Sequence, residues 1–267
     1  MLSLRICIVP LLLVLLTLPG CSRESYTLLM QAARFGDVQG VWKYAAEGFN
    51  VNEKTKHGKT ALILAASTGH TKAVEALVDL GADVQAQDNN GATALILAAT
   101  EGHADVVRAL LARGANVGAK DHDGATALLN AVFFGHREAA VELLKYKQGI
   151  DVLDLHEAML IAAGMGHIEI VKDLIQNQIS VNVTGRNQRT PLMAAVKFER
   201  VETVRLLVEN GSDPTPKNTE GDTALKVAQD QGNKEIIDLL EKALMPKRVE
   251  PPAESPPIIE NSLPPLP

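Results

Sequence analysis

The sequence predicts an all-α repeat solenoid of about seven stacked units, and three observations lead to this fold class. The stretch "GKTALILAASTGH" at residues 58–70 returns 33 residues later as "GATALILAATEGH". Each copy places an alanine at the same phase, and a small residue there lets neighbouring helices approach closely. The chain is 46% hydrophobic but only 3% aromatic. Ala, Leu, Val and Ile must therefore fill the core, which suits closely stacked helices.

The opening letters of this stretch resemble the end of a phosphate-binding loop, and the repeat argues against that function. A phosphate-binding loop needs a second glycine five residues before Gly58, but the chain has Glu53 there. A catalytic loop normally occurs once, whereas this stretch recurs. We therefore expect no nucleotide. Gly58 is expected to free the turn, Thr60 to cap a helix, and Lys59 to lie on the surface.

The N-terminus predicts a targeting segment that is not part of the folded domain. Arg5 precedes the apolar stretch "ICIVPLLLVLLTLP", which is too short to span a bilayer core of about 30 Å as a helix. The closing "LPGC" at residues 18–21 resembles a bacterial lipoprotein signal. This resemblance implies a signal peptide over 1–20, lipidation of Cys21, a short linker over 21–25 and, through Ser22, sorting to the outer membrane. The alternative is an ordinary secretory signal in which Cys21 has no role.

The repeating units fill the chain from residue 26 to residue 245. Their anchors are Thr27, Thr60, Thr93, Thr126, Glu157, Thr190 and Thr223, with spacings of 33, 33, 33, 31, 33 and 33 residues. Five residues after each anchor stands Ala32, Ala65, Ala98, Ala131, Ala162, Ala195 or Ala228. No single unit can bury its apolar face alone, so the core lies between neighbouring units.

The unit resembles the ankyrin repeat. The match is close at residues 58–70 and 81–84, at 91–103 and 114–117, and at 124–136. The resemblance implies two antiparallel helices and a finger-like turn per unit, stacked into a curved solenoid. The family's proline after the anchor threonine is kept only at Pro191, and we expect the fold to tolerate its loss because proline at the first helical position is favourable but dispensable.

Unit five and the C-terminal tail depart from the pattern. Unit five lacks the anchor threonine, and Asp154 with Glu157 is interpreted as a replacement capping box. We expect an altered bend of the solenoid there. Residues 246–267 are rich in proline, which predicts a disordered, partly polyproline II tail. The tail is either a recognition ligand or spacer, or it is dispensable.

The sequence gives little indication of catalysis or of metal or cofactor binding. His70, His103, His136 and His167 belong to the repeat's own Gly-His pairs, where we expect them to cap the second helices. No catalytic motif is present in the sequence, so we expect no enzyme activity, metal, cofactor or small-molecule substrate. The net charge of −6 makes nucleic-acid binding unlikely, since no basic excess can neutralise phosphates.

A protein partner is expected on the concave face, where ankyrin proteins usually bind. Two variable residues precede each Gly-His pair, and four of the five phenylalanines fall at these positions. Exposed aromatic residues on a rigid face are typical of binding hot spots; the alternative is that each packs over its own repeat. Basic fingers favour an acidic or mixed-charge partner, although Glu220 and Asp222 reverse the sign on the last finger. The predicted binding residues are Phe35, Lys54, Lys56, His57, Lys59, Phe133, Phe134, Met165, Arg186, Arg189, Lys197 and Phe198.

Two functions fit these expectations. The first is a lipid-anchored protein-binding scaffold of the bacterial cell envelope, held at the outer membrane and facing the periplasm. The second is an immunity or inhibitor protein that neutralises one envelope-acting toxin or enzyme. The repeat fold alone does not identify the partner, because binding specificity lies in a few surface side chains.

Overall fold

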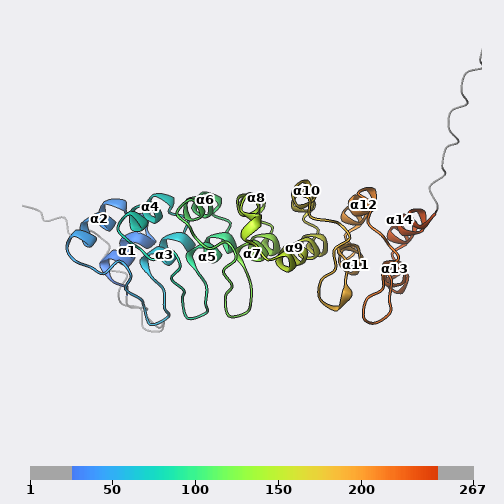
Figure 1. Cartoon of the computed structure of the whole chain (residues 1–267), viewed down its shortest axis with the longest axis horizontal. Coiled ribbons are helices and arrows are strands. Elements are labelled where there is room, and N and C mark those ends of the chain that lie inside the picture. The colour runs from blue at the N-terminus through green and yellow to red at the C-terminus, as the bar shows by residue number, and fades with distance from the viewer. Residues whose placement is uncertain (1–25, 246–267) are drawn as a thin grey trace, which may run out of the picture. The chain divides into compact units, whose positions relative to one another are not determined.

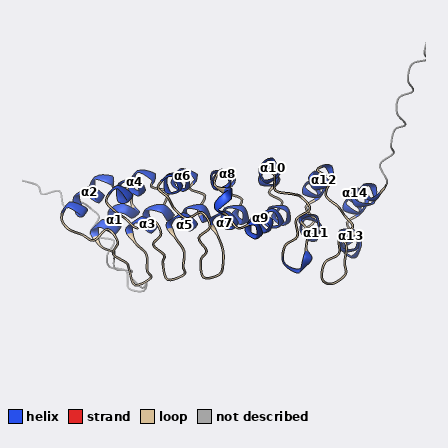
Figure 2. Cartoon of the chain, in the orientation of Figure 1, coloured by secondary structure: helices blue, strands red, loops and turns tan. Residues whose placement is uncertain are grey.

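The computed structural model describes residues 26–245, which form fourteen α-helices and two short 3-10 turns (Figures 1 and 2). The predicted signal peptide, Cys21 and the proline-rich tail lie outside the described residues. Within 26–245 the only β-type pairings are isolated bridges, such as Gln87 with Thr93. The prediction of an all-α repeat solenoid is confirmed. The chain divides into two compact units, Met1–Ala158 and Met159–Pro267, here called the N-terminal and C-terminal units.

Each repeat supplies a first helix and then a second helix. The first helices are α1 (Leu28–Arg34), α3 (Ala61–Ser67), α5 (Ala94–Thr100), α7 (Ala127–Phe134), α9 (Val152–Met165), α11 (Pro191–Lys197) and α13 (Ala224–Gln231). The second helices are α2 (Val38–Ala46), α4 (Thr71–Asp79), α6 (Ala104–Ala112), α8 (Arg137–Leu144), α10 (Ile168–Gln176), α12 (Val201–Glu209) and α14 (Lys234–Leu244). The 3-10 turns are η2 (Lys147–Gly149) and η3 (Arg186–Gln188).

The anchor threonines start the first helices, as predicted. Each of the six is an N-cap whose Oγ1 accepts a hydrogen bond from the backbone N–H three residues later, at 3.2–3.3 Å. These bonds satisfy one of the N–H groups that a helix start leaves without a partner. The repeat spacing therefore fixes where each first helix begins.

The core of each unit lies between the stacked first helices and the second helices that cover them. In the N-terminal unit, α3 packs on α1 and α5, and α5 packs on α7; in the C-terminal unit, α11 packs on α13 and α12 on α14. The phased alanines Ala65, Ala98 and Ala131 have no exposed surface. Among the described residues the buried apolar side chains are Ala, Val, Leu, Ile, Met and Pro, with no aromatic ring. Trp42, the chain's single tryptophan, lies 44% exposed on α2.

The Gly-His histidines occupy the N-cap positions of second helices, but they do not cap them. No side-chain capping bond is made at His70, His103, His136 or His167. The His136 ring instead covers Gly102 of the preceding repeat, where an added Cβ would lie 2.6 Å from Nδ1. Its Nε2 lies 3.0 Å from the Thr100 carbonyl oxygen. In repeat six Arg200 takes this place and donates from Nε to the Gly164 carbonyl at 3.1 Å. These side chains join neighbouring repeats, and the predicted capping role is wrong.

Side chains also join neighbouring fingers. The Asn52 amide donates to the Gly81 carbonyl at 3.1 Å and its oxygen accepts from the Asp83 N–H at 2.7 Å. In a parallel row, Lys54 Nζ donates to the Gln87 carbonyl at 2.8 Å, and the Gln87 amide lies 3.5 Å from the Lys120 carbonyl. Each finger is thereby fixed to the next one at a spacing of one repeat.

Repeat five has no finger, and α9 takes its place. The helix begins at Val152, and Asp151 Oδ1 accepts from the Leu153 N–H at 2.8 Å. Asp154 is buried, and its Oδ1 accepts from Lys120 Nζ at 3.0 Å. Asp154 therefore ends the row of contacts between fingers. Asp154 and Glu157 both lie inside α9, so the predicted capping box is wrong. The altered bend stays a prediction.

A buried carboxylate also joins the second helices α6 and α8. Arg108 and Lys145 donate to the two oxygens of Glu142 at 3.2 and 2.8 Å. Burial alone would raise the pKa of Glu142, but the hydrogen bonds from Lys145 and Arg108 outweigh it and leave that pKa below its ordinary value. Glu142 is therefore held ionised and links two repeats.

Gln188 stands where four other fingers have a glycine, two residues before the anchor. Its φ of 54° lies in the left-handed region, where Gly58, Gly91, Gly124 and Gly221 have φ of 76–88°. A side chain in this conformation costs about 1–2 kcal/mol, partly offset by the freedom glycine has in the unfolded chain. Gln188→Gly is expected to raise the free energy of unfolding by about 0.5–1 kcal/mol, measured by urea titration. Gln188→Ala keeps the Cβ and serves as the control; equal stabilisation by both variants would contradict this explanation.

Candidate protein-binding surfaces

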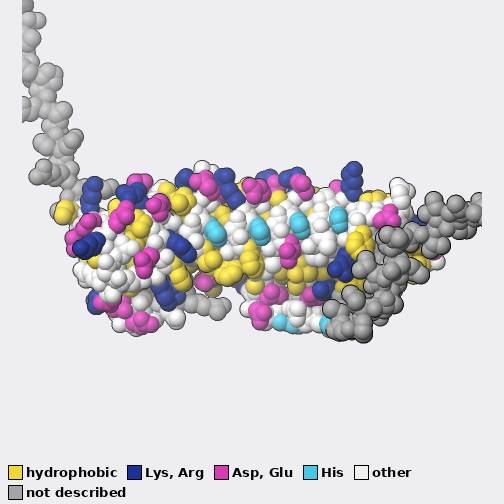
Figure 3. Space-filling view, turned by 180° about the vertical axis from the view of Figure 1, so that it is seen from behind, with side chains coloured by type: hydrophobic (Ala, Val, Ile, Leu, Met, Phe, Trp, Pro, Cys, Tyr) yellow, Lys and Arg dark blue, Asp and Glu magenta, His cyan; other side chains and the backbone are white. Residues whose placement is uncertain are grey.

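Phe133 and Phe134 form an exposed aromatic pair in the N-terminal unit. They end α7, and they are 47% and 53% exposed. Their rings meet edge to face with centroids 5.1 Å apart, and Phe134 stacks on His136 at 6.2 Å. Figure 3 shows histidine side chains recurring along one face of the repeats, with hydrophobic side chains beside them. The pair is a preformed apolar projection on a rigid helix, as a binding hot spot requires.

The equivalent positions of repeats two and three are polar and already hydrogen-bonded. Thr100 Oγ1 donates to the Ile96 carbonyl at 2.8 Å and accepts from the Asn130 amide at 3.0 Å. Thr68 Oγ1 likewise donates to the Leu64 carbonyl at 2.9 Å. These hydroxyl groups serve their own repeats, so the aromatic pair is the feature best suited to anchor a partner.

Phe35 lies at the equivalent position of repeat one, three repeats from Phe134. It is 67% exposed at the C-cap of α1. The neighbouring Arg34 guanidinium lies 5.4 Å from the Tyr26 ring centre. At about 10 Å per repeat, Phe35 forms a separate apolar point rather than part of the Phe133–Phe134 pair.

The predicted basic finger residues of the N-terminal unit differ in their availability. Lys56 and His57 are exposed. The Lys54 ammonium is bound to the Gln87 carbonyl, which gives it a structural role. Lys59 is half-buried, and its carbonyl and N–H close the finger by bonding to Thr55. Lys56 and His57 are therefore exposed at the finger tip, whereas Lys54 is exposed with its ammonium bonded and Lys59 is half-buried.

Three further predicted residues lie at the ends of first helices in the C-terminal unit. Met165 ends α9 and is 37% exposed. Phe198 is 50% exposed, and its ring lies over Gly164, where an added Cβ would meet Cδ2 at 3.2 Å. Lys197 Nζ lies 6.0 Å from the Phe198 ring centre. Phe198 thus packs over Gly164 of the preceding repeat and still exposes half of its ring.

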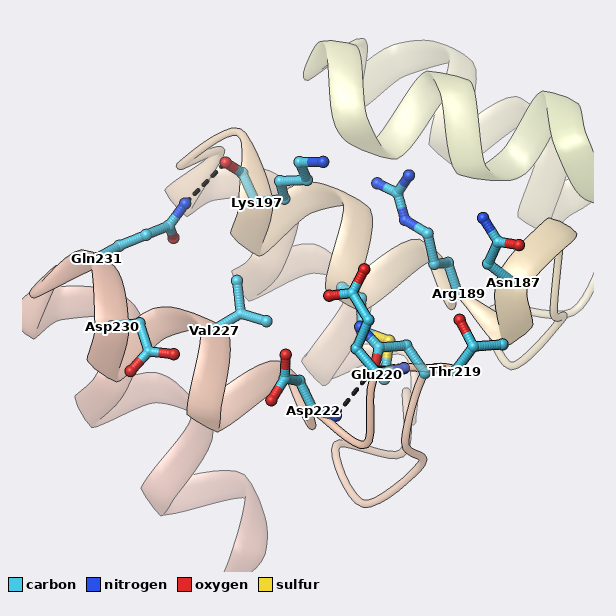
Figure 4. Close-up of a pocket in the computed structure, with 11 residues that line it drawn as sticks. Asn187, Arg189, Lys197, Thr219, Glu220, Asp222, Val227, Asp230 and Gln231 are labelled. Carbon is cyan, nitrogen blue, oxygen red and sulfur yellow. Dashed lines mark hydrogen bonds between the residues drawn. The ribbon is translucent and has the colours of Figure 1, made fainter.

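The finger residues Arg186 and Arg189 lie on either side of the η3 turn. Arg186 opens η3, and its side chain lies outside the described residues. Arg189 lines an open hollow of ≈ 500 Å³ between repeats six and seven, together with Lys197 (Figure 4). The opposite wall carries Glu220, Asp222 and Asp230.

This hollow was not predicted as a site, although parts of both walls were named. One signal in the sequence points to it, since residues 33 or 34 apart face each other on adjacent repeats. Gln231, for example, donates from its amide to the Lys197 carbonyl 34 residues earlier, at 2.8 Å. Within residues 26–245 no group of three or more His, Cys, Asp or Glu side chains is arranged to hold a metal ion.

Comparison with known proteins identifies the family. The model of "Ankyrin repeats (3 copies)" matches residues 7–88, 29–121, 81–156 and 155–247. The chain belongs to the ankyrin-repeat family.

Similar solved structures and sequences support this assignment. The ankyrin repeat domain of human ASB11 aligns with a TM-score of 0.73 and 28% identity, covering 83% of this chain and 99% of that one. The domain of Bcl-3, a member of the IkappaB family, aligns with a TM-score of 0.71 and 28% identity, covering 82% and 100%.

Among curated sequences, an ankyrin repeat and KH domain-containing protein of Caenorhabditis briggsae is 33% identical over 85 residues, which is 31% of this chain and 3% of that protein. Protein phosphatase 1 regulatory subunit 12A of Mus musculus is 36% identical over 85 residues, which is 32% of this chain and 8% of that protein. The chain thus spans only a small part of these relatives' length.

The fold is that of a protein-interaction scaffold, and its family is typically non-enzymatic. None of the described helices combines the length and the apolar character that crossing a bilayer would need. Among the described residues, the Phe133–Phe134 pair and the hollow between repeats six and seven are exposed features suited to meet a partner.

Proposed function

We propose that this chain is a lipid-anchored scaffold of the bacterial cell envelope, held at the outer membrane and facing the periplasm, which binds a protein partner through its fingers and first-helix ends. The observation that carries the binding role is the exposed Phe133–Phe134 pair on α7. Two large rings on a rigid helix bury much area at low entropy cost. A partner with an apolar pocket, rimmed by acidic or mixed charge, fits this pair and the basic finger tips.

The anchoring part of the proposal rests on the N-terminal sequence. "LPGC" at 18–21 provides the cysteine expected to carry lipid, and Tyr26, the first described residue, follows five residues later. Several acyl chains on one residue would give stable attachment, since a single chain binds only weakly. The first repeat would then lie close to the membrane surface.

The test uses a photo-crosslinking amino acid at position 134 in the full chain, expressed in a bacterial envelope. We expect a discrete crosslinked protein, identified by mass spectrometry. In affinity purification without the crosslinker, the variant F133A/F134A is expected to capture at least tenfold less of that protein than the wild type, because the apolar contact is lost. A crosslinker at Glu75, exposed on α4, is the matched control. Unchanged capture by the correctly folded double variant would contradict the assignment of this face.

The same cells test the anchor. The wild-type chain is expected in the outer-membrane fraction and to incorporate labelled fatty acid, whereas Cys21→Ser is expected to lose both. A soluble, unlabelled wild-type chain would remove the envelope part of the proposal and leave the binding part standing. If the crosslinked partner is an envelope-acting toxin or enzyme that loses activity in the complex, the scaffold acts as its inhibitor.

A further inference from the structure

The hollow between repeats six and seven has two walls of opposite charge. The repeat-six wall carries Arg189 and Lys197, while the repeat-seven wall carries Glu220, Asp222 and Asp230 (Figure 4). Each wall comes from one finger and the first helix that follows it. The charge sign therefore changes across the step from one repeat to the next.

Contacts within repeat seven hold its wall in place. Asn218 Oδ1 accepts hydrogen bonds from the backbone N–H groups of Glu220 and Asp222, each at 2.9 Å. Lys226 pairs with Asp230, and this bond, with the nearby charge of Asp222, raises the pKa of Lys226. The loop and α13 are thus ordered without using the Glu220 or Asp222 carboxylates.

Several charged groups of the hollow make no direct side-chain contact among the described residues, although the Asp222 charge acts on Lys226. No hydrogen bond or ion pair within 26–245 engages the Arg189 guanidinium or the carboxylate oxygens of Glu220 and Asp222. No ion pair crosses the hollow. The two walls are held apart by the repeat stacking instead of neutralising each other, so both charges remain available to a ligand.

The floor of the hollow is apolar. Met193 of α11 is 4% exposed, and Val227 of α13 is half-buried. Methylene stems of long charged side chains pack well on such a floor while their heads reach polar walls. A volume of ≈ 500 Å³ is within the range of sites for small ligands or a few side chains. It suits a short peptide segment.

We propose that this hollow binds a short extended segment of the partner protein that carries an acidic side chain and a basic side chain in a fixed order. The acidic side chain faces Arg189, and the basic one faces Glu220 and Asp222. This inference rests on the proposed binding function and specifies the partner's chemistry. A segment with one sign of charge would meet repulsion from one wall, and a segment in the reverse order would meet it from both.

The test is a selection of random short peptides displayed on phage against the detergent-purified full chain. Peptides enriched on the wild type are expected to share an acidic and a basic residue in one order and at one spacing. On the variant R189E/K197E/E220K/D222K the order is expected to reverse. The control variant R205E/E235R reverses an exposed ion pair between α12 and α14, away from the hollow, and is expected to enrich the wild-type pattern.

A synthetic peptide from the wild-type selection then gives the size of the change in binding affinity. Fluorescence anisotropy is expected to show at least tenfold weaker binding to R189E, and recovery when the peptide's acidic residue is changed to lysine. The same charge pattern on all variants, or no enriched charge pattern, would overturn the inference. F133A/F134A should leave this peptide's binding unchanged, so failure of the aromatic site and failure of the hollow are distinguishable. Circular dichroism checks that each variant is folded.

Discussion

Replacing Ala98 with leucine is expected to lower the free energy of unfolding by about 3 kcal/mol. Ala98 is fully buried on α5, which packs against α3 on one side and α7 on the other. Added methylene groups would have to push helices apart or adopt strained rotamers, because protein interiors leave few voids. The change is measured as the shift of the urea midpoint.

The control for this overpacking is Ala112→Leu, the same exchange on an exposed residue that ends α6. It is expected to change the free energy of unfolding by less than about 0.5 kcal/mol. A small effect at both positions would show that the positions of the phased alanines do not require small residues. It would then contradict the close helix approach that explains the alanine in every repeat.

Replacing Lys120 with methionine is expected to lower the free energy of unfolding by about 2 kcal/mol. Lys120 neutralises Asp154, whose side chain is only 10% exposed and whose Oδ2 is buried without a hydrogen bond. Removing the ammonium leaves a buried charge without compensation. The Lys120 side chain is itself 45% exposed, so solvent screens part of its attraction to Asp154. The expected decrease in the free energy of unfolding is therefore smaller than for a fully buried ion pair.

A second substitution separates the charge from the packing. Lys120→Met with Asp154→Asn removes both charges, and it is expected to be more stable than Lys120→Met alone. Lys72→Met, on the exposed part of α4, should have little effect. If the double variant is less stable than Lys120→Met, the buried carboxylate is stabilised by something other than Lys120.

Features that depend on one repeat were predictable from the sequence. The threonine N-caps and the phased alanines depend on local spacing, and the structure confirms both. The histidine role could not be read in the same way, because the His136 ring acts on Gly102 and Thr100 of the preceding repeat. Its position next to a helix start suggested capping, although the ring is directed toward the neighbouring repeat.

Asp154 also has a role that its neighbours in the sequence do not reveal. A carboxylate three residues before a glutamate near a helix start is typical of a capping box, and no residue close to it in the sequence indicates another role. The residue that explains it is Lys120, 34 residues earlier. The aromatic pair was predicted because it breaks the repeat consensus locally. The hollow was not predicted, because its two walls come from adjacent repeats and form one site only when those repeats stack.

The position of the single tryptophan determines what fluorescence can report about this chain. Trp42 lies in repeat one, half-exposed on α2, so its emission follows the local environment of the first repeat. Circular dichroism averages over all fourteen described helices. Unfolding curves that coincide in the two signals would indicate a cooperative transition. Fluorescence that changes first would indicate fraying from the N-terminal end, as nearest-neighbour coupling in repeat proteins allows.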